Sequence, residues 1–341
     1  MRQKLVGLLL IILFTGVVGV IAQDETIRID TRFVSVPVIV SDRNGRYVPN
    51  LTAADFTILQ DGSPQNIEFF AATEEPLTIA LLIDTSQSTR PVLGDIKDSA
   101  KSLIKLLSPQ DRAMIVSFDY DTHILSPLTS DQEQLKRAVK SAEVPDGQFG
   151  TVLRDAAFQT VNRSFASIKG RKAVIILTDG KDAGSRISSG DLIYSLQESD
   201  TLVYTIMFKT DDQLRQQRFP GIGRRGGGIF GGGGRFPRGG GQNRRDNPRR
   251  EERIERINQE AQEFLQKLSD TTAGRFYSSK DGKLKKTFAM IVEELRFQYR
   301  LGFYPPEEIG ERSLHDLKVK VSLPETVVRS RGSYRVQNKA N

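Results

Sequence analysis

The chain has 341 residues, long enough for one large domain plus a smaller one or for two medium ones, and its 38% hydrophobic and 27% charged residues are typical of a folded protein. It has no cysteine and only two histidines, His123 and His315, which excludes disulfides, zinc–thiolate sites, cysteine nucleophiles and histidine-rich metal sites. The formal net charge is +7, but residues 215–250 alone hold ten arginines against one aspartate, so the remainder is mildly acidic.

The N-terminus has the pattern of an exported protein. Arg2 and Lys4 precede an apolar run at 5–20, and Ala22 follows as a small residue. The run is shorter than the roughly 20 residues that span a bilayer, and no cysteine follows for lipid attachment. We therefore expect residues 1–22 to be a signal peptide and the mature protein to reach the periplasm, the cell surface or the medium. An uncleaved membrane anchor is the alternative.

The next segment, 27–73, alternates apolar and polar residues as β-strands do. Asn44-Gly45 and Asp61-Gly62 are strong hairpin signals within it. Residues 298–338 alternate in the same way. We expect these two segments to pair into one small all-β domain, with everything between them inserted.

Between the β segments, residues 77–297 alternate apolar strand runs with helical patterns, which indicates parallel βαβ units. The expected strands are 79–84, 113–118, 173–177 and 202–208, with a short antiparallel edge at 123–128. A helix in this block is expected to end with Gly274 at its C′ position. The fold class predicted is α/β, with a Rossmann-like, doubly wound and mainly parallel central sheet.

Residues 212–251 interrupt this block with a sequence dominated by glycine, arginine and proline. Such a segment buries too little apolar surface to offset its ordering entropy, so we expect a disordered loop. Residues 221–226 match G-x-G-x-x-G, but the glycine-rich surroundings lack the strand and helix of a dinucleotide site. The cationic part, 215–250, could bind an anionic polymer or a membrane surface, or act as a passive linker. Nucleic acid is disfavoured as a partner by the expected export.

Polar side chains stand at the end of the first predicted parallel strand, in the sequence TIALLIDTSQST. Asp84 ends the apolar run, and the hydroxyls of Ser86 and Ser88 follow at alternate positions. Ligands of open parallel sheets bind at the carboxyl ends of strands, near the point where strand order reverses. One carboxylate with two hydroxyls is an oxygen-only environment, which hard divalent cations prefer.

Two further segments supply oxygen ligands to the same edge. Asp179 follows the strand 173–177, and Thr151 lies in a loop just before a helix. The nearby acids Asp155 and Asp182 are interpreted as a helix start and a solvated loop position. The candidate metal ligands are therefore Asp84, Ser86, Ser88, Thr151 and Asp179.

These residues, in this order and spacing, resemble the metal-ion-dependent adhesion site (MIDAS) of the von Willebrand factor A (VWA) domain. The resemblance covers about residues 77–296, and the flanking β segments resemble the bacterial VWFA-related acidobacterial domain family. It implies that Ser86 and Ser88 bind the cation through their hydroxyls. It also implies that Thr151 binds in the ligand-engaged state, Asp179 binds directly or through water, and Asp84 acts mainly through a coordinated water.

The function implied is binding rather than catalysis. Mg²⁺, with Mn²⁺ or Ca²⁺ as alternatives, would bridge the site to a Glu or Asp of a protein partner. One departure from the family pattern is Phe149, which stands before Gly150 where many members have a second glycine. A magnesium-dependent phosphatase or hydrolase is the enzymatic alternative. It is disfavoured because aspartyl nucleophiles of phosphoryl transfer usually have a second aspartate two residues on, where this chain has Ser86.

Overall fold

The computed structural model describes residues 33–72, 75–208, 248–279, 284–306 and 313–336. The predicted signal peptide, 1–22, lies outside these ranges, as does most of the predicted loop 212–251. The last four residues of that loop range, 248–251, are the beginning of a helix. Within the described ranges, no helix is both long enough and apolar enough to cross a membrane.

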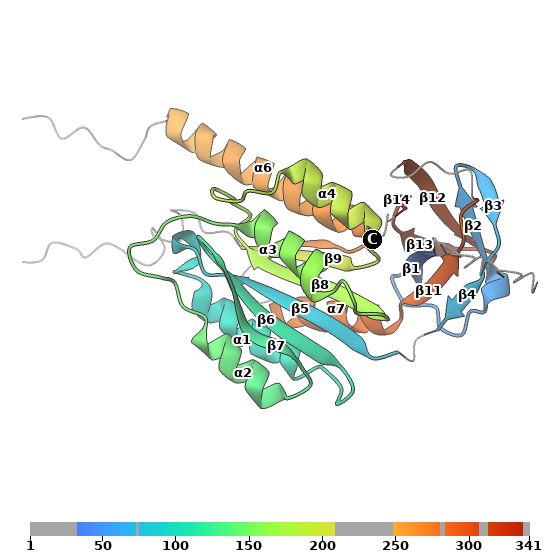
Figure 1. The fold of residues 1–341 in the computed structure, drawn as a ribbon, viewed down its shortest axis with the longest axis horizontal. Helices are drawn as coiled ribbons and strands as arrows, with labels where there is room; N and C mark the ends of the chain where they lie inside the picture. The colour runs from blue at the N-terminus through green and yellow to red at the C-terminus, as the bar shows by residue number, and fades with distance from the viewer. Residues whose placement is uncertain (1–32, 73–74, 209–247, 280–283, 307–312, 337–341) are drawn as a thin grey trace, which may run out of the picture. The chain divides into compact units, whose positions relative to one another are not determined.

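A six-stranded sheet forms the centre of the inserted block, in the order β10-β9-β8-β5-β6-β7 (Figure 1). All neighbours are parallel except β6 and β7, which are antiparallel at one edge. The bounds are β5 (Leu77–Asp84), β6 (Arg112–Phe118), β7 (Thr122–Thr129), β8 (Arg171–Thr178), β9 (Leu202–Phe208) and β10 (Phe276–Ser279). The mainly parallel α/β fold expected from the sequence is confirmed, and β10 is a strand that the sequence did not indicate.

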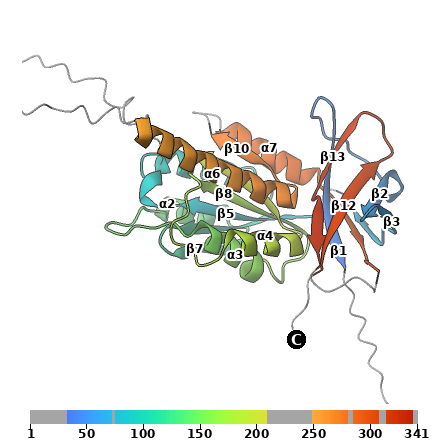
Figure 2. The ribbon, with the colours of Figure 1, turned by 90° about the horizontal axis from the view of Figure 1, so that it is seen from above.

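Helices cover both faces of this sheet, as Figures 1 and 2 show. On one face lie α1 (Leu93–Ile104), α2 (Gln132–Ser141) and α7 (Leu284–Arg296), and on the other α3 (Leu153–Gln159), α4 (Ser189–Glu198) and α6 (Pro248–Thr272). Strand β5 serves both cores, since Leu81 packs on the first face and Leu82 on the second. Burial on both faces explains why its sequence is apolar without alternation.

The β segments from the two chain ends pair with each other. The first sheet has the order β13-β1-β11-β4 and the second β14-β12-β2-β3. Every pair within these two sheets is antiparallel. The bounds are β1 (Val34–Asp42), β2 (Phe56–Gln60), β3 (Ser63–Gln65), β4 (Phe69–Ala71), β11 (Tyr299–Phe303), β12 (Leu314–Val321), β13 (Thr326–Ser330) and β14 (Ser333–Arg335). The α/β block is therefore inserted between strands that are neighbours in space, as predicted.

One of two local expectations needs correction. Asn44-Gly45 does form the expected hairpin turn, because the Asp42 N–H donates to the Arg46 carbonyl at 2.8 Å, the Val48 N–H donates to the Val40 carbonyl at 3.0 Å, and Ser41 bridges Tyr47. The hairpin is short, and β1 pairs mainly with β11 and β13. At the end of α6, the residue with a left-handed backbone is Ala273, with φ of +67°, and not Gly274.

Candidate functional site

The sheet has its switch point between β5 and β8. The chain leaves β5 for β6 on one side and later returns to β8 on the other side. Ile83 pairs with Leu177 across the last register of these strands, so Asp84 and Asp179 follow at adjacent strand ends. This is the position at which open α/β sheets bind ligands.

The first loop holds its polar groups in a fixed arrangement. Asp84 is completely buried, and its Oδ1 accepts a hydrogen bond of 2.9 Å from the Ser86 backbone N–H. Its Oδ2 accepts one of 2.6 Å from the Thr178 hydroxyl, which comes from the end of β8. The Ser86 and Ser88 hydroxyl oxygens lie 3.1 Å apart. The loop is thus tied to both strands before any ligand binds.

The charge of Asp84 is poorly stabilised by the protein itself. Burial raises the pKa of this carboxyl above its ordinary value, and the nearby Asp179 carboxylate raises it further. Hydrogen bonds from Ser86 and Thr178 oppose the shift only in part. A cation beside Asp84 would favour the ionised form of this carboxyl.

Asp179 already has a cationic neighbour that sequence reasoning missed. Its side chain is 1% exposed, and Oδ2 accepts a hydrogen bond of 2.9 Å from the ammonium of Lys181. Oδ1 lies 3.2 Å from the Lys181 backbone nitrogen, which donates to it. The signal was present in the sequence, because a residue two positions after a strand-end aspartate can fold back on it.

The loop that carries Thr151 is fastened to both neighbouring strand ends. The carbonyl of buried Thr151 accepts a hydrogen bond of 3.1 Å from the Ala183 N–H, beyond Asp179. The N–H of Val152 donates to the Asp119 carbonyl, at the end of β6, over 2.7 Å. Asp119 in turn accepts, through Oδ2, from the Thr85 hydroxyl at 2.9 Å. These contacts connect the three loops that contain the five predicted ligands.

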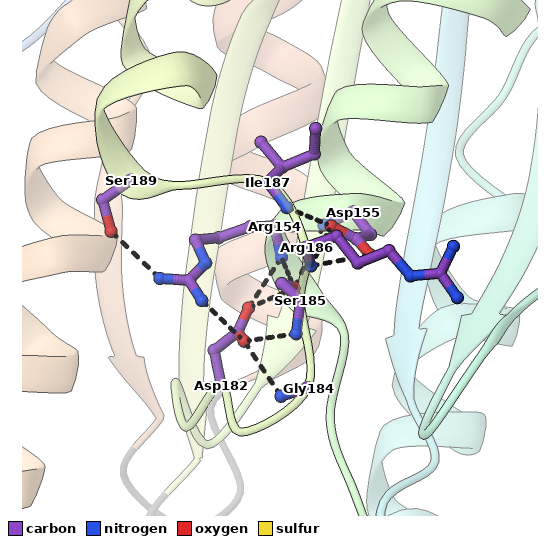
Figure 3. Close-up of polar contacts among 8 residues, drawn as sticks. All are labelled: Arg154, Asp155, Asp182, Gly184, Ser185, Arg186, Ile187 and Ser189. Atoms are coloured by element: carbon purple, nitrogen blue, oxygen red, sulfur yellow. Dashed lines mark hydrogen bonds and ion pairs between the residues drawn. The ribbon is translucent and has the colours of Figure 1, made fainter.

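Asp182 and Asp155, interpreted from sequence as a solvated loop position and a helix start, reinforce this connection (Figure 3). The Asp182 carboxylate accepts from the Arg154 N–H at 2.9 Å and from the Ser185 hydroxyl at 2.7 Å. It also forms an ion pair of 3.2 Å with the Arg154 guanidinium. Asp155, in the first turn of α3, accepts from the Ile187 N–H at 2.8 Å. Both acids therefore fix the segment after Asp179 against the start of α3.

Phe149 is exposed rather than packed into the site. Its side chain is 82% exposed, and Tyr120, on the neighbouring loop, is 43% exposed. Gly150 between Phe149 and Thr151 has φ of +146°, and a Cβ there would lie 3.3 Å from the Tyr120 Cα. The glycine is needed for this close approach, and it leaves two aromatic side chains at the rim beside Thr151.

The donor set fits a hard cation. Among the described residues, no group of three or more His, Cys, Asp or Glu side chains could hold a metal, so a site here depends on hydroxyls. The 3.1 Å separation of the Ser86 and Ser88 oxygens matches two adjacent corners of an octahedron, which are about 3 Å apart when ligands lie at about 2.1 Å.

Comparison with known sequences agrees with the fold. The family model of the von Willebrand factor type A domain matches residues 79–181, which begin in β5 and include all five candidate ligands. The chain contains a von Willebrand factor type A domain. A search of curated proteins found no match.

Several solved structures are similar to the chain. BatB from Bacteroides thetaiotaomicron is 17% identical with a TM-score of 0.43, covering 64% of this chain and 98% of that one. The vWF domain of the type V pili tip protein Mfa5 from Porphyromonas gingivalis is 12% identical with a TM-score of 0.44, covering 65% and 95%. Proximal thread matrix protein 1 from the mussel byssus, solved with a zinc-occupied MIDAS motif, is 16% identical with a TM-score of 0.46, covering 70% and 50%.

Proposed function

We propose that the chain is an exported binding protein whose VWA domain recognises an acidic side chain of a protein partner through a divalent cation. The proposed cation is Mg²⁺, with Mn²⁺ or Ca²⁺ as substitutes. Its proposed ligands are Asp84, Ser86, Ser88, Thr151 and Asp179. The observation that carries the proposal is the pair of hydroxyls 3.1 Å apart beside two buried carboxylates at the switch point of the sheet.

The residues of the site are oriented before binding. The hydrogen bonds from Thr178 and the Ser86 backbone fix the Asp84 carboxylate, so little ordering is left to do when a ligand arrives. The Thr151 loop is held from both sides by backbone hydrogen bonds. A cation bound here would offer an open coordination position to a carboxylate from another molecule.

The charge balance suits an acidic partner. Asp84 and Asp179 would together neutralise a divalent cation, and the ammonium of Lys181 adds a positive charge beside them. An incoming Glu or Asp would therefore meet a centre that carries no net negative charge. A basic or neutral side chain would gain nothing comparable from it.

The test measures the binding of the cation first and the binding of a partner peptide second. Titration of Mn²⁺ into the purified protein should show one saturable site, which Asp84→Ala and Ser86→Ala remove. Asp98→Ala, which changes an acid on α1 with a 75% exposed side chain, should leave it intact. Peptides selected on the Mg²⁺-loaded protein should contain Asp or Glu, and replacement of that acid by its amide should abolish binding. Peptide binding that is unchanged by EDTA would exclude the proposal.

A further inference from the structure

Lys181 places a positive charge on one of the proposed metal ligands. Its ammonium lies 2.9 Å from Oδ2 of Asp179, while its own backbone N–H donates to Oδ1. The carboxylate it meets is 1% exposed, unlike that of Asp98, which is 75% exposed and pairs with Lys101 on the surface of α1. The contact therefore neutralises a buried charge and is not an ordinary surface ion pair.

The ammonium and a metal ion would compete for the same carboxylate. A buried carboxylate without a partner is unstable, so Lys181 stabilises Asp179 in the metal-free protein. The lone pair of Oδ2 that accepts the hydrogen bond from the ammonium cannot coordinate a metal ion at the same time. Two cations on one buried carboxylate also repel each other more strongly than they would in water.

We infer that Lys181 is an internal competitor that lowers the affinity of the site for divalent cations and leaves Asp179 when the metal binds. The inference rests on the proposed function, because it concerns the same site. The Lys181 side chain is 35% exposed, so solvent is within reach of its ammonium when it is released. After release the ammonium is still tethered two residues from Asp179, where its positive charge attracts the acidic side chain of a partner.

Mutation of this lysine should tighten metal binding. In Mn²⁺ titrations of the full chain followed by electron paramagnetic resonance, Lys181→Met should bind about tenfold more tightly than wild type, which corresponds to about 1.4 kcal/mol. Lys181→Arg keeps the charge and should stay close to wild type. The matched control is Lys101→Met, because the Lys101 side chain is 37% exposed and also paired with an aspartate. In an Asp179→Asn background the effect of Lys181→Met should disappear.

A second measurement needs no variant. Acetylation of Lys181 by acetic anhydride, measured by mass spectrometry, should increase when saturating Mn²⁺ is added, whereas that of Lys101 should not change. If wild type and Lys181→Met bind Mn²⁺ equally, or Lys181 reactivity is unchanged by the metal, the competition is excluded while the proposed function stands. If no variant binds Mn²⁺ at millimolar concentration, both are overturned.

Discussion

The buried carboxyl group of Asp84 lowers the stability of the metal-free protein. Burial and the Asp179 charge raise its pKa to about 7 in the folded protein, above the 3.8 of an ordinary aspartate. A group with a raised folded pKa contributes most stability below its unfolded pKa and loses that contribution as pH rises through the folded one. The metal-free protein should therefore become less stable between about pH 4 and neutrality on account of Asp84.

We expect Asp84→Asn to separate the effect of the Asp84 charge on metal-free stability from its effect on metal binding. In EDTA at pH 8 the variant should melt about 2–4 °C above wild type, the shift that about 1 kcal/mol gives in a domain of this size. Near pH 4 the difference should vanish. Mg²⁺ should raise the melting temperature of wild type by mass action and leave Asp84→Asn unchanged. Calorimetry measures both, with Asp98→Asn as the control. A Mg²⁺-dependent shift that persists in Asp84→Asn would remove Asp84 from the site.

Phe149 is an exposed aromatic residue two positions before the proposed ligand Thr151. Because its side chain is 82% exposed beside Thr151, we expect it to contact the partner and not the cation. Burial of a phenylalanine contributes about 1.5–3 kcal/mol, so Phe149→Ser should weaken binding of a selected acidic peptide by at least about tenfold. Mn²⁺ affinity should be unchanged. The control is Leu323→Ser, another exposed apolar residue at 41%. A parallel loss of Mn²⁺ affinity would show that Phe149 acts on the Thr151 loop.

Two adjacent residues at the C-terminus of α6, Ala273 and Gly274, are constrained for different reasons. The helix end sets the backbone of Ala273, and a contact with a strand leaves no room for a side chain at Gly274. The N–H of Gly274 donates to the Ser269 carbonyl at 3.0 Å, and that of Ala273 to Asp270 at 3.4 Å, which is the pattern of a Schellman motif. Ala273 takes the left-handed conformation, usually a glycine position. Gly274 is required for a different reason, because a Cβ there would lie 1.9 Å from the Val203 carbonyl oxygen in β9.

These two positions should respond to mutation in opposite directions. Ala273→Gly removes a strained left-handed alanine and should stabilise the protein by about 1 kcal/mol. Gly274→Ala forces α6 away from β9 and should destabilise it by about 3 kcal/mol. Urea unfolding measures both changes. If Gly274→Ala were tolerated without loss, the contact between the α6 terminus and β9 would not be as close as described.

Sequence patterns predicted those elements whose burial is regular. Strand β5 is buried on both faces, so its sequence is a continuous apolar run. Helix α1 is buried on one face, so its apolar residues recur at helical spacing. The residue pattern alone therefore predicts both elements. Strand β10 was missed because it has only four residues and none of them is fully buried. Of the candidate site, four of the five proposed oxygen ligands follow from strand ends, and the fifth, Thr151, follows from its place just before a helix. The contacts of Asp182 with Arg154 do not, because they join residues 28 positions apart.

Glu294 connects the inserted VWA domain to the β frame, the two antiparallel sheets formed by β1–β4 and β11–β14. It lies on α7 with a 1% exposed side chain, and its carboxylate accepts from the Tyr204 hydroxyl at 2.6 Å and the Arg275 guanidinium at 2.8 Å. On the other side it forms an ion pair with Arg329 of β13 and accepts at 3.4 Å from the hydroxyl of Tyr47. Burial raises the pKa of the Tyr204 and Tyr47 hydroxyls, and the negative charge of Glu294 is the second largest cause. No local pattern predicts this cluster, because its members come from five separate segments.

Loss of this carboxylate should loosen the connection between the two parts of the molecule. Glu294→Ala leaves two arginines without their counter-charge, of which Arg329 is the more buried, so we expect a loss of about 3 kcal/mol in urea unfolding. The β frame and the VWA domain should then unfold in separate transitions, because fewer contacts couple them. The control is the exposed neighbour, Glu293→Ala. In the double variant Glu294→Ala/Arg329→Met the loss should be at least about 1 kcal/mol smaller than the sum of the single losses, because the unpaired Arg329 charge is removed. A single cooperative transition of wild-type stability in Glu294→Ala would mean that apolar packing alone holds the VWA domain in its frame.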